Sequence, residues 1–367
     1  MLFYWIIFII LFALAFSSNN KTWKINYKIA FWLLLILGAT RAVTVGNDLH
    51  GGYSAEFKVM GEEPSTWGSV MPQFEYCFFW LMAFWKFHIG TSTGLQFFQF
   101  LFAVTFSCYA YYIWKNSRRP ATVLFFMFAL ANYFSLYNTM RQNFAFSLIL
   151  IALLLVDKYK NNERKGYILF TIATVLISLA FHRSQVILLV LIPIFVWYNK
   201  ISTKIMVISL VVSSIASYTL AKFSFSILSQ MSYLLADSSS NFYNYMNDLD
   251  NAGEYSQVSN ILNTIFCIYV VYCSRHSKDR YLVAYVLGII LLNILTPISG
   301  IYERIAASFI FFRIFVYTRL WYTIPNRIER NIFRIGMLAY CVIMFQNRLI
   351  NDNYEDVLPY INAYFNF

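Results

Sequence analysis

Residues 142–181 read QNFAFSLILIALLLVDKYKNNERKGYILFTIATVLISLAF, and this stretch decides the fold class. Two apolar runs, at 142–157 and 166–181, lie on either side of a short polar segment with four basic residues. Such runs are typical of transmembrane helices, because a helix needs about 20 apolar residues to cross the hydrocarbon core. Similar runs recur over the whole chain. The sequence therefore predicts an all-α polytopic membrane protein, with residues 1–367 as a single integral membrane domain.

The composition excludes the other large classes of protein. Of the 367 residues, 59% are hydrophobic and only 12% are charged, whereas soluble domains carry about 25% charged residues. This balance excludes an ordinary soluble enzyme and a disordered chain. The five cysteines lie mostly inside apolar runs, and no Cys or His spacing indicates a metal. We therefore expect no metal and no cofactor.

Hydropathy predicts twelve transmembrane helices. They lie near residues 2–17, 28–45, 95–114, 121–137, 142–157, 166–181, 185–199, 204–222, 258–274, 281–298, 303–322 and 331–348. The first run is followed rather than preceded by lysines, so we interpret it as an uncleaved span. A thirteenth stretch, 76–87, is interpreted as an interfacial or re-entrant helix, because counting it as a span would turn the basic loop at 158–165 outward.

The charges separate according to this topology. The segments assigned to the inner face hold 19 of the 28 Lys and Arg residues but only 4 of the 17 Asp and Glu residues. Basic residues collect in cytoplasmic loops of membrane proteins, so the net charge of +11 reports membrane orientation. We therefore expect no nucleic-acid partner.

Two outer loops are long enough to contribute to a site, at 46–75 and 223–257. The second contains Asp248-Leu249-Asp250, a pattern of paired carboxylates that can hold a divalent ion. A lone pattern of this kind inside an acidic loop is a weak signal, and we predict no metal site there.

Three arginines interrupt the acidic outer face, each where a predicted span meets the surface: Arg141, Arg183 and Arg304. Arg41 lies at a similar depth at the end of the second span. The polar residues around each of these arginines can also form an ordinary turn between helices. A plain turn, however, requires no arginine on the outer face. Guanidinium groups bind phosphate oxygens in bidentate fashion, so arginines at one depth suit a diphosphate.

The same clusters contain candidates for a general base. His182 is the only histidine among them, and imidazole titrates near neutral pH. A structural, hydrogen-bonding histidine is an equally good interpretation. Asp48, Glu75 and Glu303 are alternative bases, or they orient the arginines.

The order of these motifs resembles the EpsG family of Wzy-type polysaccharide polymerases. The resemblance extends from Arg41 to Tyr360. It rests on Arg41, Gly46-Asn47-Asp48, Tyr53 and Phe57, then Glu75, Met140-Arg141-Gln142, Phe181-His182-Arg183-Ser184 and Leu358-Pro359-Tyr360. Family members often have a small residue where this chain has Arg183, so Arg183 has a less secure role than Arg141.

This resemblance implies a bacterial inner-membrane glycosyltransferase of the GT-C type that works at the periplasmic face. It implies donor and acceptor repeat units carried on undecaprenyl diphosphate, surrounding membrane lipid and a chain-length regulator as partners. The reaction would be inverting and independent of a metal, and the product would be O-antigen, capsule or exopolysaccharide.

The predicted site combines both lines of argument. Arg141, Arg183, Arg304 and Arg41 are assigned to the diphosphate, and His182, Asp48 and Glu75 to catalysis. Gln142, Glu303, Tyr53 and Tyr302 are assigned to substrate positioning, and the loop residues Trp67, Tyr243 and Tyr245 are further candidates for stacking on sugar rings.

Three rival functions remain open from the sequence. An O-antigen ligase performs the same chemistry but usually has one dominant outer loop. A lipid-linked oligosaccharide flippase should show repeat symmetry and ionisable residues at mid-membrane depth. A membrane O-acyltransferase would also use a His and an Arg.

Overall fold

The structure is a computed structural model. It describes residues 2–17, 22–46, 49–61, 75–90, 94–162, 165–234, 257–275, 279–297, 303–351, 353 and 356–364. The chain divides into two compact units. The first unit comprises Met1–Val186 and Ile328–Phe367, and the second comprises Ile187–Arg327.

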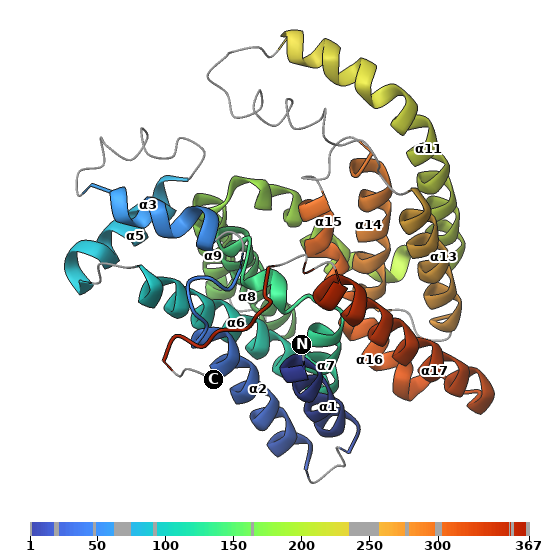
Figure 1. Ribbon diagram of the computed structural model, residues 1–367. Helices are drawn as coiled ribbons and strands as arrows, with labels where there is room; N and C mark the ends of the chain where they lie inside the picture. The colour runs from blue at the N-terminus through green and yellow to red at the C-terminus, as the bar shows by residue number, and fades with distance from the viewer. Residues whose placement is uncertain are drawn as a thin grey trace. The chain divides into compact units, whose positions relative to one another are not determined.

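The first unit is built from apolar helices and short helical segments (Figure 1). Its helices are α1 (Leu2–Phe16), α2 (Trp23–Ala39), α3 (Ser54–Val59), α5 (Tyr76–Phe84), α6 (Leu95–Asn116), α7 (Pro120–Ala129), α8 (Met140–Asn162), α9 (Lys165–Phe181) and α17 (Arg327–Met344). Helices α8 and α9 run antiparallel in close contact, because the polar segment between them is short.

The second unit is also helical. It contains the second half of η5 (Arg183–Val190), and then α10 (Leu191–Trp197), α11 (Thr203–Leu234), α13 (Gln257–Cys273), α14 (Arg280–Leu295), α15 (Glu303–Ile310) and α16 (Arg313–Thr323). The buried Asn293 of α14 donates to Ser213 Oγ of α11 at 3.0 Å and to Thr264 Oγ1 of α13 at 2.9 Å. Polar side chains of this kind hold helices together where the surroundings are apolar.

Every predicted span overlaps helical structure, but the helix in the span at 28–45 ends at Ala39, and three other spans are broken. The span at 121–137 ends as α7 at Ala129, and a turn with a positive φ at Ala131 follows. The span at 185–199 divides into η5 and the short α10, which contains Pro193. The span at 303–322 divides into α15 and α16. By contrast, α11 is longer than the predicted span at 204–222. It continues to Leu234, so the first part of the predicted loop at 223–257 is helical.

Three of the described helical stretches are both long and apolar enough to cross a membrane: Leu95–Asn116, Met140–Tyr159 and Glu303–Thr323. Six more are apolar but shorter. The structure is therefore that of a helical membrane protein, and the count of twelve spans stays a prediction.

Helix α5 occupies most of the predicted interfacial stretch at 76–87. It continues as the π-helix η3 (Trp85–Ile89), and the two together extend over about 20 Å at about 1.5 Å per residue, short of the about 30 Å of a bilayer core. One face buries Phe78, Phe79 and Met82, while Tyr76 and Trp80 are exposed on the other.

Aromatic residues form the core of the first unit. The edge-to-face pair of Phe102 and Tyr137 has ring centres 5.5 Å apart, and Tyr133 packs at right angles to Phe102 at 5.9 Å. Gly38 makes this packing possible, because a β-carbon there would lie 2.0 Å from the Phe102 ring. Helices α2 and α6 therefore approach closely at this glycine.

The chain ends in an extended segment, residues 356–364, which we call the C-terminal strap. Figure 1 shows it in dark red beside the segment that follows α2. Residues Arg41 and Asn362 form an isolated antiparallel β-bridge between these two segments.

Candidate active site

The centre of the candidate site is the carboxylate of Glu75. Glu75 precedes the first residue of α5 in an extended conformation, and its side chain does not cap its own helix. The carboxylate is therefore available to other elements. It contacts one residue from α8 and two from the junction that follows α9.

Each carboxylate oxygen of Glu75 has its own partners. Oε2 accepts a hydrogen bond from Arg141 Nη1 at 2.6 Å. Oε1 lies 3.3 Å from His182 Nδ1 and accepts the backbone N–H of Arg183 at 3.0 Å. The side chains of Glu75 and Arg141 retain 11% and 14% exposure, so the ion pair is largely screened from water yet reachable from one side.

Arg141 is placed by both α8 and α5. It is the second residue of α8, and its guanidinium lies 5.9 Å from the centre of the buried Phe78 ring of α5. A guanidinium held over an aromatic ring has less rotational freedom, but its N–H groups can still donate hydrogen bonds. The bond to Glu75 and the contact with the Phe78 ring together fix the position of the guanidinium.

The start of α8 and the end of α9 are packed together directly. The rings of Phe144 and Phe181 meet edge to face at 4.9 Å, and Ser178 Oγ donates to Ala145 O at 2.8 Å. These two contacts keep His182, which follows α9, beside Arg141 in the first turn of α8.

The turn before α8 has an unusual backbone that Asn143 supports. Thr139 has φ 32°, a left-handed value that is costly for a β-branched residue. Asn143 Nδ2 donates to Ser135 O at 2.8 Å and to Thr139 Oγ1 at 2.9 Å, while Asn143 Oδ1 accepts from Tyr109 OH at 3.0 Å. These bonds compensate for the backbone strain one residue before α8 begins.

Glu75 stays ionised in this setting. Burial raises the pKa of Glu75, but the adjacent His182 imidazole, the charge of Arg141 and the N–H of Arg183 together lower it below its usual value. A carboxylate beside Nδ1 favours the imidazole tautomer with the proton on Nδ1. Nε2 of His182 is then the nitrogen that can accept a proton.

Two other predicted residues of the first unit lie elsewhere. The Arg41 guanidinium is 1% exposed and lies 4.3 Å from the centre of the Tyr137 ring, where it donates to Gly38 O and Tyr137 O. The buried Tyr53 ring packs against Phe78 and Phe98, each at 5.7 Å. Both side chains point into the protein core, so neither has a face open to substrate. Gln142 is half-buried beside Arg141 in the first turn of α8.

The remaining predicted residues are in the second unit or outside the described residues. Glu303 is half-buried and Arg304 exposed in the first turn of α15. Asp48, Tyr302, Trp67, Tyr243, Tyr245 and Asp248-Leu249-Asp250 lie outside the described residues. In the part of the chain that the structure describes, no three His, Cys, Asp or Glu side chains are grouped so that they could hold a metal ion.

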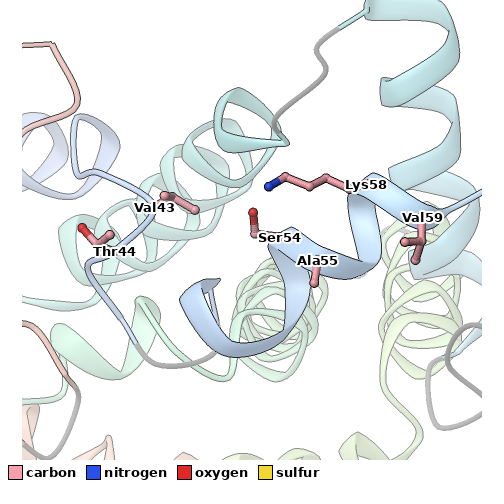
Figure 2. A pocket seen from close by; sticks show the side chains of 6 residues that line it. All are labelled: Val43, Thr44, Ser54, Ala55, Lys58 and Val59. Atoms are coloured by element: carbon pink, nitrogen blue, oxygen red, sulfur yellow. The ribbon is translucent and has the colours of Figure 1, made fainter.

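A separate hollow of about 440 Å³ lies between the Val43–Thr44 turn and α3. Figure 2 shows Ser54, Ala55, Lys58 and Val59 projecting from α3 on one side and Val43 and Thr44 on the other. The Lys58 side chain reaches back across the hollow toward Val43. Its lining is mostly apolar, with one amine and two hydroxyls.

Sequence reasoning missed the residues that support the site. Asn143 directly follows the Met140-Arg141-Gln142 motif, but only the positive φ at Thr139 explains its contribution. Phe78 is one of many phenylalanines in the apolar stretch at 76–87, and no local signal distinguishes it. Its position under Arg141 follows from how α5 packs against the rest of the unit.

Comparison with known proteins places this arrangement in a family. No curated protein and no solved structure matches the chain. The EpsG family matches residues 24–362, nearly the whole length, and this range includes Glu75, Arg141 and His182. The chain therefore belongs to the EpsG family, a family of Wzy-type polymerase-like proteins.

Proposed function

We propose that this protein is an inverting, metal-independent glycosyltransferase of the GT-C type that polymerises oligosaccharide repeat units carried on undecaprenyl diphosphate. The observation that carries the proposal is the Glu75 carboxylate, which holds Arg141 and His182 together in a member of the EpsG family. The site would lie at the periplasmic face of the bacterial inner membrane. The product would be O-antigen, capsule or exopolysaccharide, with a chain-length regulator as a partner.

Arg141 is assigned to the diphosphate of the donor. When the glycosidic bond breaks, negative charge develops on the diphosphate, and a preorganised guanidinium stabilises it. Arg141 lies in the first turn of α8, where the helix dipole also favours an anion. The exposed side chain of Arg183 is the second ligand that we assign from the first unit.

His182 is assigned as the general base. Its Nε2 accepts the proton of the acceptor hydroxyl while the hydroxyl oxygen forms a bond to the anomeric carbon of the donor. The bond from that carbon to the diphosphate oxygen breaks, and undecaprenyl diphosphate leaves with the electron pair. Glu75 orients the imidazole and stabilises its positive charge, as a buried carboxylate does in other proton-transfer sites.

Other residues complete the proposal. Asp48 is the alternative base. Arg304 stays a candidate for diphosphate binding and Glu303 and Tyr302 for substrate positioning, and Gln142 would contact the sugar beside Arg141. Arg41 and Tyr53 are left out because both side chains are buried among aromatic rings.

A complementation experiment tests the proposal. The gene is deleted in the native strain and restored with wild type, Arg141→Lys or Arg118→Lys, and the cell-surface polysaccharide is separated on a gel. Arg118 is an exposed arginine that follows α6 and serves as the matched control. We expect Arg118→Lys to restore the ladder and Arg141→Lys to restore little of it, because lysine cannot make the bidentate contact.

The pattern in the deletion strain separates the rival functions. A single repeat unit on the lipid A core identifies a polymerase. No repeat unit on the core, with polymer accumulating on the carrier lipid, identifies a ligase. A normal ladder with Arg141→Lys or Arg141→Ala at wild-type protein levels would show that the diphosphate assignment is wrong.

A further inference from the structure

We propose that the C-terminal strap is a positioning element of the active site, which acts through Arg41 on the turn that carries Arg141. The inference rests on the proposed function, because it concerns how the diphosphate ligand Arg141 is placed. It makes Arg41 a positioning residue. It also gives a role in the site to the strap, which is far from the site residues in the sequence.

The strap is tied to the segment after α2 by its backbone. Ala42 N donates to Ile361 O at 2.9 Å, and Ala363 N donates to Thr40 O at 2.8 Å. Gly46 N donates to Asp356 O at 2.9 Å. The strap therefore fixes both ends of residues 40–46, the segment that contains Arg41 and one wall of the hollow in Figure 2.

Side chains secure the strap at its middle and at its C-terminal end. Tyr360 stacks on Phe3 with ring centres 4.9 Å apart and donates to Leu37 O at 2.9 Å. Tyr364 OH donates to Gln99 Oε1 at 2.6 Å, and Gln99 Nε2 in turn donates to the Arg41 carbonyl at 3.1 Å. The backbone of Arg41 is thus held by the strap directly and through α6.

The side chain of Arg41 connects this segment to the turn before α8. Nη1 donates to Gly38 O at 3.2 Å and Nη2 to Tyr137 O at 3.4 Å. Nη2 also lies 3.7 Å from the sulfur of Met140, the residue directly before Arg141. A buried guanidinium with two carbonyl partners fixes the distance between the end of α2 and the start of α8.

Gly46 makes a second connection to the same turn. Its φ is 103°, and a β-carbon there would lie 3.1 Å from Asn138 Oδ1 and 3.3 Å from Tyr137 O. The strap therefore reaches Tyr137 and Asn138 by two routes, one through the Arg41 side chain and one through the Gly46 backbone. Both routes end within four residues of Arg141.

This arrangement matters because the contact between Arg141 and the diphosphate depends strongly on the position of the guanidinium. A shift of about 1 Å in a ligand or catalytic group can reduce a rate about a hundredfold. Loosening the strap should therefore weaken diphosphate binding through a displaced Arg141, although no strap residue touches the diphosphate.

The test is a double-mutant cycle on the full-length protein purified in detergent, with farnesyl diphosphate as the binding probe. The variants are Tyr360→Ala and Arg41→Lys, each alone and combined with Arg141→Lys. Arg41→Lys keeps the charge but cannot bridge the carbonyls of Gly38 and Tyr137. It tests the same connection if Tyr360→Ala fails to fold. Ile361→Ala is the matched control, because that side chain is 43% exposed and only its backbone carbonyl contacts the segment after α2.

Arg141→Lys alone should weaken binding about tenfold, the loss of one charged hydrogen bond. As single changes, we expect Tyr360→Ala and Arg41→Lys each to weaken farnesyl diphosphate binding about threefold to tenfold. In a protein that already carries Arg141→Lys, we expect each to weaken binding further by less than about twofold. Ile361→Ala should bind like wild type. Equal losses in both backgrounds, or no loss in wild type, would overturn the positioning role. If Arg141→Lys itself leaves binding unchanged, the proposed function fails instead.

Discussion

The two oxygens of Glu75 serve different residues, and this division defines the chemistry of the site. One oxygen neutralises Arg141, and the other orients His182 through Nδ1. A single carboxylate therefore sets the position of an anion-binding group relative to a proton acceptor. Changing any one of the three residues should affect the other two.

His182→Gln should reduce the rate of polymerisation about a hundredfold or more, which is the usual contribution of a general base. Glutamine keeps a donor toward Glu75 but cannot accept the proton. The measurement is transfer between lipid-linked repeat units in proteoliposomes. His88→Gln is the control, because His88 is exposed on the short π-helix after α5 and contacts the Phe84 ring. Equal rates for the two variants would exclude His182 as the base.

The lowered pKa of Glu75 predicts how the stability of the protein depends on pH. A carboxylate with a folded-state pKa below its unfolded value stabilises the fold above the unfolded pKa of about 4.3, and this contribution is lost as pH falls through the lower value. Thermal unfolding in detergent should show Glu75→Gln to be less stable than wild type by a constant amount above about pH 5. The difference should shrink below about pH 4. A difference that is unchanged at pH 3 would contradict the lowered pKa.

At the scale of elements, the residues of the site lie at or next to the ends of helices. Glu75 precedes α5, Arg141 lies in the first turn of α8 and His182 follows α9. The sequence predicts these ends because an apolar run stops where polar residues begin. The predicted boundaries of 142 and 181 lie two residues after the start of α8 and at the last residue of α9.

Close helix packing in the second unit can be tested at Gly288. A β-carbon there would lie 2.7 Å from Ile310 N and 3.0 Å from Phe309 C, both backbone atoms of α15. Gly288→Ala should therefore destabilise the protein by about 1–3 kcal/mol in thermal unfolding, since backbone atoms cannot easily move aside. Gly336→Ala in α17, where a β-carbon meets nothing within 4 Å, should be neutral or stabilising by up to about 1 kcal/mol. Equal effects at the two positions would refute the packing argument.

At the scale of the whole molecule, charge segregation predicts which ends of the helices face outward. Single cysteines replace Arg183, at the candidate site, and Arg118, at the basic end of α6, in a chain without native cysteines. Both positions are exposed. A membrane-impermeant maleimide added to intact spheroplasts should label position 183 and reach position 118 only after permeabilisation, because basic loops stay in the cytoplasm. The reverse pattern would move the proposed site to the inner face.

The fold class, the helical segments and the polar clusters at their ends were predictable from sequence. The length of an apolar run and the charges that bound it are local properties. The breaks at Ala129 and between α15 and α16 were not, because the residues at which the helices stop, Leu130-Ala131 and Phe311-Phe312, are apolar. A turn with a positive φ at Ala131 follows α7, and the buried Phe311 and Phe312 lie between α15 and α16.

The sequence by itself determined a helical membrane protein of the EpsG family with arginines at unexpected positions. Only the tertiary structure decided which of them can meet a ligand. Glu75 and Arg141 are 66 residues apart, and their contact depends on how α5 and α9 pack around α8. Arg41 looks the same in sequence, yet its side chain turns inward onto Tyr137 and Gly38. The direction of a side chain depends on neighbours that are distant along the chain, so hydropathy and charge alone cannot predict it.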